Sequence, residues 1–277
     1  MPLSPQHTVR HYENFPVASI LLPKRLRRPV GIIYAFARAA DDFADEGDID
    51  DATRLALLDG FRKELDNLAA GNTPVTPLFC QVAEIVAAYK LPLQPFYDLI
   101  DAFSQDVVKK RYADFGEVMD YCRRSANPVG TLLLHLYGAA TPKNLAYSNA
   151  ICSSLQLINF LQDIAIDYRE KNRIYLPLSE MAQYDISEST LAGGIVSEKW
   201  DELMLFQIER AGKLLYSGTP LGKILPGRIA LELRVIILGG ETILRKLHKN
   251  RDVFNRRPIL KWQDWPVMLW RALRWKW

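Results

Sequence analysis

Apolar and polar positions follow helical spacing along almost the whole chain. Apolar residues recur every three or four positions, whereas the alternating short runs that indicate β-strands are missing. Breakers rich in Gly and Pro divide the pattern into helix-length segments, and they lie at residues 22–23, 71–77, 91–92, 138–142, 176–177 and 218–227. None of these breakers is long enough for an interdomain linker. The sequence therefore predicts an all-α fold in a single domain that spans residues 1–277.

Two of the predicted helices are apolar on nearly every face. Residues 30–40 are almost entirely apolar and run directly into the acidic segment 41–46, and residues 151–167 are apolar with isolated polar positions. A helix that is apolar all round is a buried helix. Because a buried, unpaired carboxylate is strongly destabilising, the acidic residues of these helices need a cation or another partner.

The polar residues of these two helices form one stripe on each. At about 100° per residue, the first stripe covers an arc of roughly 60° and the second an arc of roughly 80°. The first consists of Tyr34, Arg38, Asp41 and Asp45, and the second of Gln156, Asn159, Asp163 and Asp167. Aspartates four positions apart repel one another, and oxygen ligands without a nearby His or Cys select a hard ion, Mg²⁺ before Ca²⁺ or Zn²⁺. One such pair is usually a solvated face, but two pairs in apolar helices predict a Mg²⁺-dependent diphosphate site.

Arg38 has two interpretations that the sequence does not separate. Its guanidinium is suited to hold a phosphate oxygen of the substrate by two hydrogen bonds. An ion pair with Asp41 or Asp45 on the same helix face explains the residue equally well.

Composition excludes several classes of protein. The chain has 277 residues, 49% of them hydrophobic and 24% charged, which is a globular composition, and a formal net charge of +3 gives no sign of nucleic-acid binding. Cys80, Cys122 and Cys152 are an odd number without C-x-x-C spacing, which argues against a disulfide framework or a zinc site and favours a reducing compartment. Neither a signal peptide nor an apolar run of about 18 residues is present. We therefore expect a cytoplasmic protein that does not cross a bilayer.

The C-terminal segment is basic and rich in tryptophan. Residues 243–277 carry ten Lys or Arg against two acidic residues, and five of the six tryptophans are Trp262, Trp265, Trp270, Trp275 and Trp277. Trp mixed with Lys and Arg is typical of segments that lie at a membrane surface. One hypothesis is therefore that residues 258–277 attach peripherally to the inner face of the membrane. The competing hypothesis is that they dock on the body of the protein or on another subunit.

Three blocks of the sequence resemble a known family. Residues 34–45, residues 156–167 with the following 173–177, and residues 121–130 are similar to the sequence blocks of the squalene/phytoene synthases, and the resemblance runs from about His11 to Arg257. It implies the isoprenoid-synthase fold, a helical bundle around an apolar cavity whose mouth is lined by the two aspartate clusters. It also implies Mg²⁺ as cofactor and a prenyl diphosphate as substrate.

The resemblance implies a role for particular residues. The Mg²⁺ and diphosphate ligands would be Asp41, Asp45, Asn159, Asp163 and Asp167; the residues at the reacting centre would be Tyr34, Arg38, Tyr121, Asn127 and Gln156; and the substrate-binding residues would be His11, Phe15 and Arg173. Each role has a simpler alternative. The two tyrosines are compatible with ordinary half-buried aromatics, His11 with a surface residue, and Asn159 with a locally satisfied buried amide.

Two departures from the common family pattern point to one branch. Gln162 stands where many members have Arg before the aspartate, and residues 125–128 replace the usual Val-Ala-Gly. With the opening residues 11–19 and the later 252–257, they resemble the bacterial hopanoid-pathway branch. This implies the conversion of presqualene diphosphate to hydroxysqualene, in which diphosphate is released and a water is captured. Asn127, Gln156 or Tyr121 would position that water.

Two other functions stay open. One is a head-to-head prenyl transferase that makes presqualene diphosphate, squalene or phytoene from prenyl diphosphates. The other is an inactive helical assembly factor, against which the intact aspartates Asp41, Asp45, Asp163 and Asp167 count. Other enzymes of the same lipid pathway are expected partners.

Overall fold

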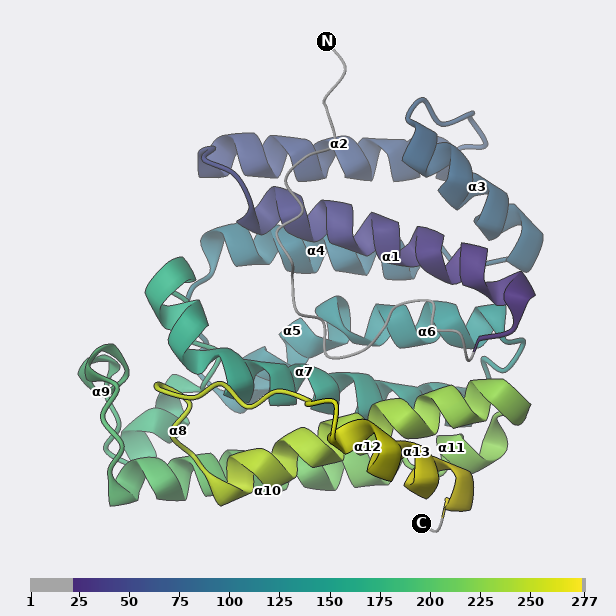
Figure 1. Cartoon of the computed structure of the whole chain (residues 1–277). Helices are drawn as coiled ribbons and strands as arrows, with labels where there is room; N and C mark the ends of the chain where they lie inside the picture. The colour runs from purple at the N-terminus through teal and green to yellow at the C-terminus, as the bar shows by residue number, and fades with distance from the viewer. Residues whose placement is uncertain (1–21, 276–277) are drawn as a thin grey trace.

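The computed structural model describes residues 22–275, and this range is built from α-helices (Figure 1). The helices are α1 (Lys24–Asp45), α2 (Asp51–Ala69), α3 (Pro77–Tyr89), α4 (Gln94–Val108), α5 (Phe115–Ser125), α6 (Asn127–Leu136), α7 (Pro142–Lys171), α8 (Leu178–Gln183), α9 (Glu188–Gly193), α10 (Glu198–Gly218), α11 (Leu221–Ile224), α12 (Gly227–Lys249) and α13 (Asp264–Arg274). The described range holds no strand, only one isolated parallel bridge between Arg111 and Ile174. The all-α prediction is confirmed.

The helix boundaries follow the breakers and the capping residues of the sequence. Gly71, with a φ of 79°, lies between α2 and α3, and Gly138, with a φ of 65°, lies between α6 and α7. Glycine adopts this left-handed backbone without the strain that a Cβ brings. At the other ends, the side chains of Asp50 and Asp114 accept hydrogen bonds from the first-turn amides of α2 and α5.

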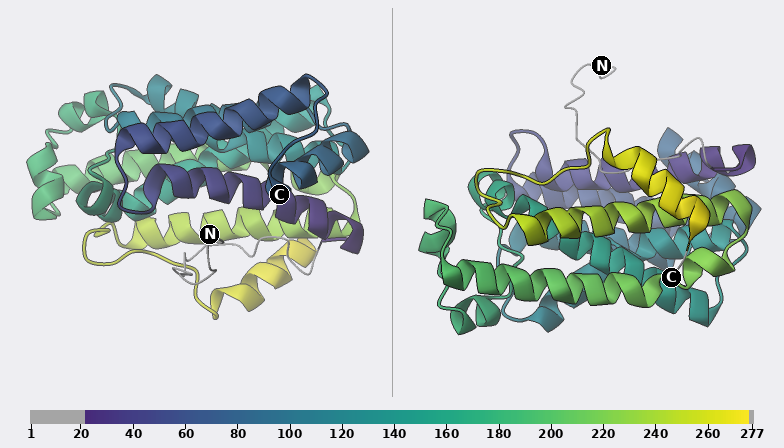
Figure 2. Two further views of the ribbon diagram at one scale, coloured as in Figure 1. Left: turned by 90° about the horizontal axis from the view of Figure 1, so that it is seen from above. Right: turned by 60° about the horizontal axis from the view of Figure 1, so that its bottom comes forward.

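The helices form two groups joined by a middle pair. α1, α2, α3 and α4 pack together at one side, and α7, α10, α12 and α13 at the other (Figures 1 and 2). The pair α5 and α6 lies between them, because both helices contact α4 as well as α7. The most extensive helix contact is that of α7 with α10. No helix within residues 22–275 is long and apolar enough to cross a membrane.

The two helices that carry the polar stripes are largely buried, as the sequence predicts. Phe36 of α1 is fully buried and meets the rings of Phe61, Phe79 and Phe96, with centroids 5.0–5.7 Å apart. α7 contacts α10 and α12 of its own group and both helices of the middle pair, α5 and α6. It also contacts α9 and α11. The stripes are therefore carried by helices whose apolar residues lie in the core.

Three helices end close together, and this meeting point positions the candidate site. α1 ends at Asp45, α4 at Val108 and α7 at Lys171. The segments that leave α4 and α7 are joined by a hydrogen bond of 3.0 Å from the amide of Ile174 to the carbonyl of Lys110. The last carbonyls of a helix carry a partial negative charge, so three such ends attract cations.

Candidate active site at three helix ends

Arg173 lies at the centre of the three helix ends. Its side chain is 4% exposed, and it donates to a carboxylate oxygen of Asp45 at 2.5 Å and to the backbone carbonyl of Asp106 at 2.9 Å. It therefore links the last residue of α1 to the last turn of α4. The family resemblance implies that Arg173 binds substrate, and this role stays a prediction.

Asp45 is held by two cations. Besides the Arg173 guanidinium, the ammonium group of Lys171 forms an ion pair with it. Burial alone would raise the pKa of Asp45, but the hydrogen bond and charge of Arg173 together with Lys171 lower the pKa below its usual value. Asp45 is thus a charged carboxylate at neutral pH.

Asp41, one turn earlier on α1, has a different environment. Burial, and then the negative charge of Asp45, raise its pKa to about 6. Arg38 contacts Asp41 at 3.4 Å and Asp42 at 2.7 Å, so the ion pair that the sequence allowed is present, with Asp42 as a second partner. A contact of Arg38 with diphosphate stays a prediction.

The second stripe, on α7, faces the same region. Arg257 forms an ion pair with Asp163, in which its Nη2 lies 3.0 Å from Oδ2. Burial, and then the charge of Asp163, raise the pKa of Asp167 to about 7, and the charge of Asp45 adds to this rise. Since Asp45 belongs to α1 and Asp167 to α7, the two stripes act on each other electrostatically, as a shared site requires. Asn159 is exposed and Gln156 is half-buried on this stripe.

A buried carboxylate and two tyrosines lie behind Arg173. Asp106 accepts hydrogen bonds from the hydroxyl of Tyr121 at 2.5 Å and from that of Tyr175 at 3.0 Å. Burial raises the pKa of Asp106 to about 6, although the charge of Arg173 opposes this rise. Tyr121, only 3% exposed, is a fully buried member of this network rather than a half-buried aromatic.

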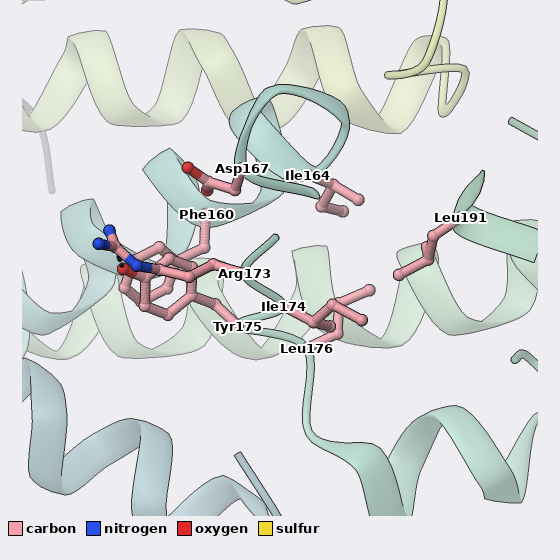
Figure 3. Close-up of a pocket in the computed structure, with 8 residues that line it drawn as sticks. All are labelled: Phe160, Ile164, Asp167, Arg173, Ile174, Tyr175, Leu176 and Leu191. Atoms are coloured by element: carbon pink, nitrogen blue, oxygen red, sulfur yellow. Dashed lines mark hydrogen bonds between the residues drawn. The ribbon is translucent and has the colours of Figure 1, made fainter. Parts of the chain in front are cut away.

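A small pocket opens beside this network (Figure 3). It encloses about 10 Å³ and is lined by Phe160, Ile164, Asp167, Arg173, Ile174, Tyr175, Leu176 and Leu191. Asp167 and Arg173 supply its charged groups, and most of the other lining side chains are apolar. The rings of Phe160 and Tyr175 stack with centroids 3.8 Å apart and form part of its wall. A second pocket, which also encloses about 10 Å³, shares Phe160, Tyr175 and Leu176 with the first.

Of the remaining predicted residues, two lie on α1 and α6 and two lie outside the described range. Tyr34 is half-buried on α1. The side-chain oxygen of Asn127 accepts a hydrogen bond of 2.9 Å from Ser153, which joins α6 to α7. His11 and Phe15 lie outside residues 22–275.

Four residues of the site were not predicted from the sequence. They are Asp106, Lys171, Tyr175 and Arg257. Tyr175 and Arg257 stand within segments that resemble the family, and this was the only signal for them. Lys171 continues the stripe of α7 one turn after Asp167, but it lies beyond the predicted helical segment 151–167. Asp106 carries no signal, because it belongs to no polar stripe on an apolar helix.

The chemistry of the site fits Mg²⁺. Asp41 and Asp167 have raised pKa values, so the positive charge around them does not fully compensate their burial. Carboxylate and amide oxygens are the ligands that Mg²⁺ prefers, together with water and substrate phosphate. Within residues 22–275, no three Asp, Glu, His or Cys side chains lie close enough to hold a metal ion by themselves. Mg²⁺ bound with diphosphate needs only one or two protein carboxylates, so the Mg²⁺ site stays a prediction.

Comparisons of the sequence with known proteins identify its family. The sequence model of the squalene/phytoene synthase family matches residues 8–265. A hydroxysqualene synthase from Rhodopseudomonas palustris is 37% identical over 250 residues, which cover 90% of this chain and 84% of that protein. A phytoene synthase from Arthrospira platensis is 31% identical over 278 residues, covering 95% and 88%.

Solved structures give the same result. The squalene synthase HpnC from Alicyclobacillus acidocaldarius superposes with a TM-score of 0.79 at 34% identity, covering 86% of this chain and 89% of that one. A dehydrosqualene synthase determined with a ligand shares the fold, with a TM-score of 0.83 at 21% identity and coverage of 93% and 89%. The isoprenoid-synthase helical fold is therefore confirmed. From the family match and these relatives, the chain belongs to the squalene/phytoene synthase family.

Proposed function

We propose that this enzyme converts presqualene diphosphate to hydroxysqualene with the help of Mg²⁺. Its family performs head-to-head prenyl chemistry, and the finer assignment is supported by the hydroxysqualene synthase that is 37% identical over 90% of the chain. The observation that carries the proposal is the site itself. Carboxylates and cations from three helix ends stand directly beside an aromatic, apolar pocket.

The proposed reaction balances without a reductant. The carbon–oxygen bond to the diphosphate breaks, and the leaving group takes the electron pair. The resulting cyclopropylcarbinyl cation rearranges to an allylic cation, and a water oxygen forms the new carbon–oxygen bond. The water then loses a proton to the released diphosphate or to a nearby carboxylate. One alcohol and one diphosphate are formed, with no hydride transfer.

The charged part of the site would hold the diphosphate. Asp41, Asp45, Asn159, Asp163 and Asp167 are the residues that would hold Mg²⁺. When bound, Mg²⁺ neutralises the charge that develops on the leaving group. The chain's own cations do part of this work, because Arg173 and Lys171 already stand beside Asp45. A guanidinium can hold a phosphate through two hydrogen bonds.

The apolar part of the site would protect the cation. The stacked rings of Phe160 and Tyr175 present aromatic faces, which stabilise a nearby positive charge, and the aliphatic lining excludes bulk water. Each pocket encloses about 10 Å³, which is about the room that one water molecule needs. Binding a long prenyl chain therefore requires the shared wall of Phe160, Tyr175 and Leu176 to move.

Tyr121 lies behind the pocket wall, with its ring centre 5.5 Å from that of Tyr175, and it is one of three residues that would hold the attacking water. The Tyr121 hydroxyl donates its hydrogen bond to a carboxylate oxygen of Asp106, with the two oxygens 2.5 Å apart. The hydroxyl oxygen can therefore accept a hydrogen bond from a water. Burial, and then the charge of Asp106, raise the pKa of Tyr121 well above its ordinary value, so the phenol stays neutral. Asn127 and Gln156 stay alternative positions for this role.

The test is an incubation of purified protein with Mg²⁺ and presqualene diphosphate, without NADPH, in water enriched in heavy oxygen. We expect an alcohol that carries the heavy oxygen, detected by mass spectrometry, and an equal amount of released diphosphate. Asp41→Asn should abolish both products. Asp59→Asn is the matched control, because Asp59 forms an exposed ion pair one turn before Lys63 on α2. If presqualene diphosphate gives no alcohol, the proposal is wrong.

A second candidate function is a head-to-head prenyl transferase. It is favoured by the phytoene synthase that is 31% identical over 95% of this chain. The same incubation with farnesyl or geranylgeranyl diphosphate as the only substrate separates the two functions. A condensation product would identify the transferase, whereas the proposed lyase leaves both substrates unchanged.

A further inference from the structure

Helix α13 has two apolar faces, and only one of them is used by the fold. Met268 and Ala272 are buried against the body, and Trp275 lies over Gly222 of α11. Two ion pairs join the helix to α12, Arg271 with Glu241 at 2.8 Å and Lys246 with Asp264. The hypothesis that the C-terminal segment docks on the body is therefore correct for this face.

The other face points away from the body and is also apolar. Trp262, just before the helix, is 78% exposed, Trp270 is 55% exposed and Leu273 is 70% exposed. At about 100° per residue, Leu269, Trp270 and Leu273 lie within an arc of roughly 100°, opposite Met268 and Ala272. We call Trp262, Val267, Leu269, Trp270 and Leu273 the outer face. Figure 2 shows α13 lying across the outside of α12, at the surface of the bundle.

Two exposed cations lie beside the outer face, in a basic part of the chain. Residues 241–275 contain nine Lys or Arg and three acidic residues. The acids at the two ends of α13's contact with the body are neutralised, since Asp264 is paired with Lys246 and Glu241 with Arg271. Lys261 and Arg274 are exposed beside the outer face, and the Arg274 guanidinium lies 4.5 Å from the centre of the Trp270 ring. The surface is thus apolar at its centre and cationic at its rim.

We propose that the outer face of α13 docks on a membrane surface that carries anionic lipid headgroups. Exposed Trp and Leu insert at the boundary between headgroups and acyl chains, and Lys and Arg are attracted to the negative surface potential. A second copy of the chain fits the same face poorly. In a symmetric dimer it would bring one cationic rim against another.

Docking here would place the active site near the lipid phase. The segment that leads into α13 passes over α7, where Arg257 pairs with Asp163 and the carbonyl of Pro258 accepts a hydrogen bond of 2.6 Å from Gln162. Four residues after Pro258 the chain reaches Trp262, the most exposed tryptophan of the described range. One short segment therefore touches both the aspartate stripe and the proposed membrane surface.

The test uses the full-length protein and two kinds of vesicle, one of phosphatidylcholine alone and one with added phosphatidylglycerol. Sedimentation measures binding, and tryptophan fluorescence reports insertion, because Trp200 is fully buried while Trp262 and Trp270 are exposed. We expect binding to the anionic vesicles with a blue shift of the emission. The triple variant Trp262→Ser, Trp270→Ser, Leu273→Ser should bind these vesicles at least about tenfold more weakly than the unchanged protein.

The matched control replaces three exposed apolar residues elsewhere. Val75→Ser, Val108→Ser and Ile195→Ser change side chains that are 83%, 64% and 53% exposed, and this variant should bind as the unchanged protein does. Lys261→Glu with Arg274→Glu should abolish the preference for anionic vesicles. Circular dichroism confirms that each variant is folded. Equal binding by the outer-face variant and the control, or no binding to either vesicle, would overturn the proposal.

Sedimentation velocity distinguishes the competing occupant. If the outer face joins two copies of the chain, the unchanged protein is a dimer without vesicles and the outer-face variant is a monomer; that result would also overturn the proposal. None of these measurements uses a substrate, so the docking proposal and the proposed reaction are tested separately.

Discussion

Three buried carboxylates of the site differ in charge because their partners differ. Arg173 and Lys171 keep the pKa of Asp45 below its usual value despite burial. Asp106 is held by two tyrosine hydroxyls, and burial outweighs them, so its pKa rises to about 6. Burial, and then the charge of the neighbouring Asp163, raise the pKa of Asp167 to about 7. Asp167 is therefore the carboxylate that would benefit most from a bound cation.

The first prediction is that Asp167→Asn stabilises the metal-free protein at high pH. Burial, and then the charge of Asp163, raise the pKa of this carboxyl in the folded protein to about 7, from an ordinary value of 3.8. A raised pKa means that the folded state binds the proton more tightly, so stability falls as the pH rises from about 4 to 7 and is then constant. The amide carries no such penalty. We expect the variant to be more stable by roughly 1–3 kcal/mol at pH 8, and by much less at pH 4.

Urea denaturation at the two pH values, in the presence of a chelator, measures this difference. Asp59→Asn is the control for a carboxylate on an exposed helix face. A stability gain that is the same at pH 4 and pH 8 would contradict the assignment of a raised pKa to Asp167.

The second prediction concerns Asp106 and its tyrosines. Asp106→Ala leaves the hydroxyls of Tyr121 and Tyr175 without their acceptor inside the core. A buried hydroxyl without a partner costs about 1–3 kcal/mol, so we expect the variant to lose roughly 2–4 kcal/mol of unfolding free energy. Asp66→Ala is a close control, because Asp66 accepts a hydrogen bond of 2.8 Å from Tyr97 at an exposed position. That control should lose about 0.5 kcal/mol, as expected for a solvated hydrogen bond, and equal losses in denaturant titrations would show that the buried network is not special.

At the scale of elements, the contact of α7 with α10 depends on one glycine. A Cβ built on Gly218 would lie 2.6 Å from the backbone oxygen of Tyr147 and 2.5 Å from Cγ1 of Ile151. Backbone has little freedom to move away, so the helix ends would have to separate. This close approach explains why Gly ends α10 at the point where it crosses α7.

The third prediction follows from that contact. Gly218→Ala should destabilise the protein by roughly 1–3 kcal/mol, through overpacking between the two helices. Gly60→Ala is the matched control, because Gly60 lies inside α2 with nothing within 4 Å of an added Cβ. There the same substitution should stabilise by about 0.5–1 kcal/mol, as Ala is the better helix former. The midpoints of thermal unfolding of both variants give the answer, and a neutral Gly218→Ala would show that the contact is looser than described.

The sequence predicted those elements of the site that carry a periodic signal. Asp41 and Asp45, and Asp163 and Asp167, are spaced by one helical turn on apolar helices, so their shared faces are visible in the sequence. Asp106 shares α4 with Asp98 and Asp101 and has no spacing that sets it apart from them, and only the meeting of three helix ends brings it to Arg173. Arg257 reaches Asp163 from a segment 94 residues later in the chain. Such contacts depend on the packing of separate elements, which no local pattern contains.

The same limit explains the mixed result for the C-terminal segment. On a helical projection of this segment, Pro266, Leu269, Trp270 and Leu273 share one apolar side. Met268 and Trp275 fall off that side, so the projection alone does not explain them. In the structure Met268 and Trp275 are buried while Trp270 and Leu273 are exposed, so there are two faces. Which face docks depends on α12 and Gly222, and those partners are not encoded near the segment itself.

At the scale of the whole molecule, an ion pair at the site joins the two helix groups. Asp45 comes from the group of α1 and α4, whereas Lys171 and Asp167 come from α7 in the other group. The ion pair of Asp45 with Lys171 crosses between them. A ligand that binds both stripes would therefore stabilise the packing of one group on the other, and not only the loops near the site.

The fourth prediction is that Mg²⁺ and inorganic diphosphate together raise the unfolding temperature more than the sum of their separate effects. Mg²⁺ alone meets Asp45 and Asp163 already paired with cations, and diphosphate alone meets uncompensated Asp41 and Asp167. Together they satisfy both sets of charges. A ligand at 100 times its dissociation constant adds about 2.7 kcal/mol, which corresponds to a shift of roughly 5–10 °C for a chain of this size. Thermal unfolding with each ligand, with both, and with both plus a chelator measures this effect. Asp41→Asn should remove the joint shift and Asp59→Asn should leave it unchanged, while additive shifts would show that metal and diphosphate bind at separate places.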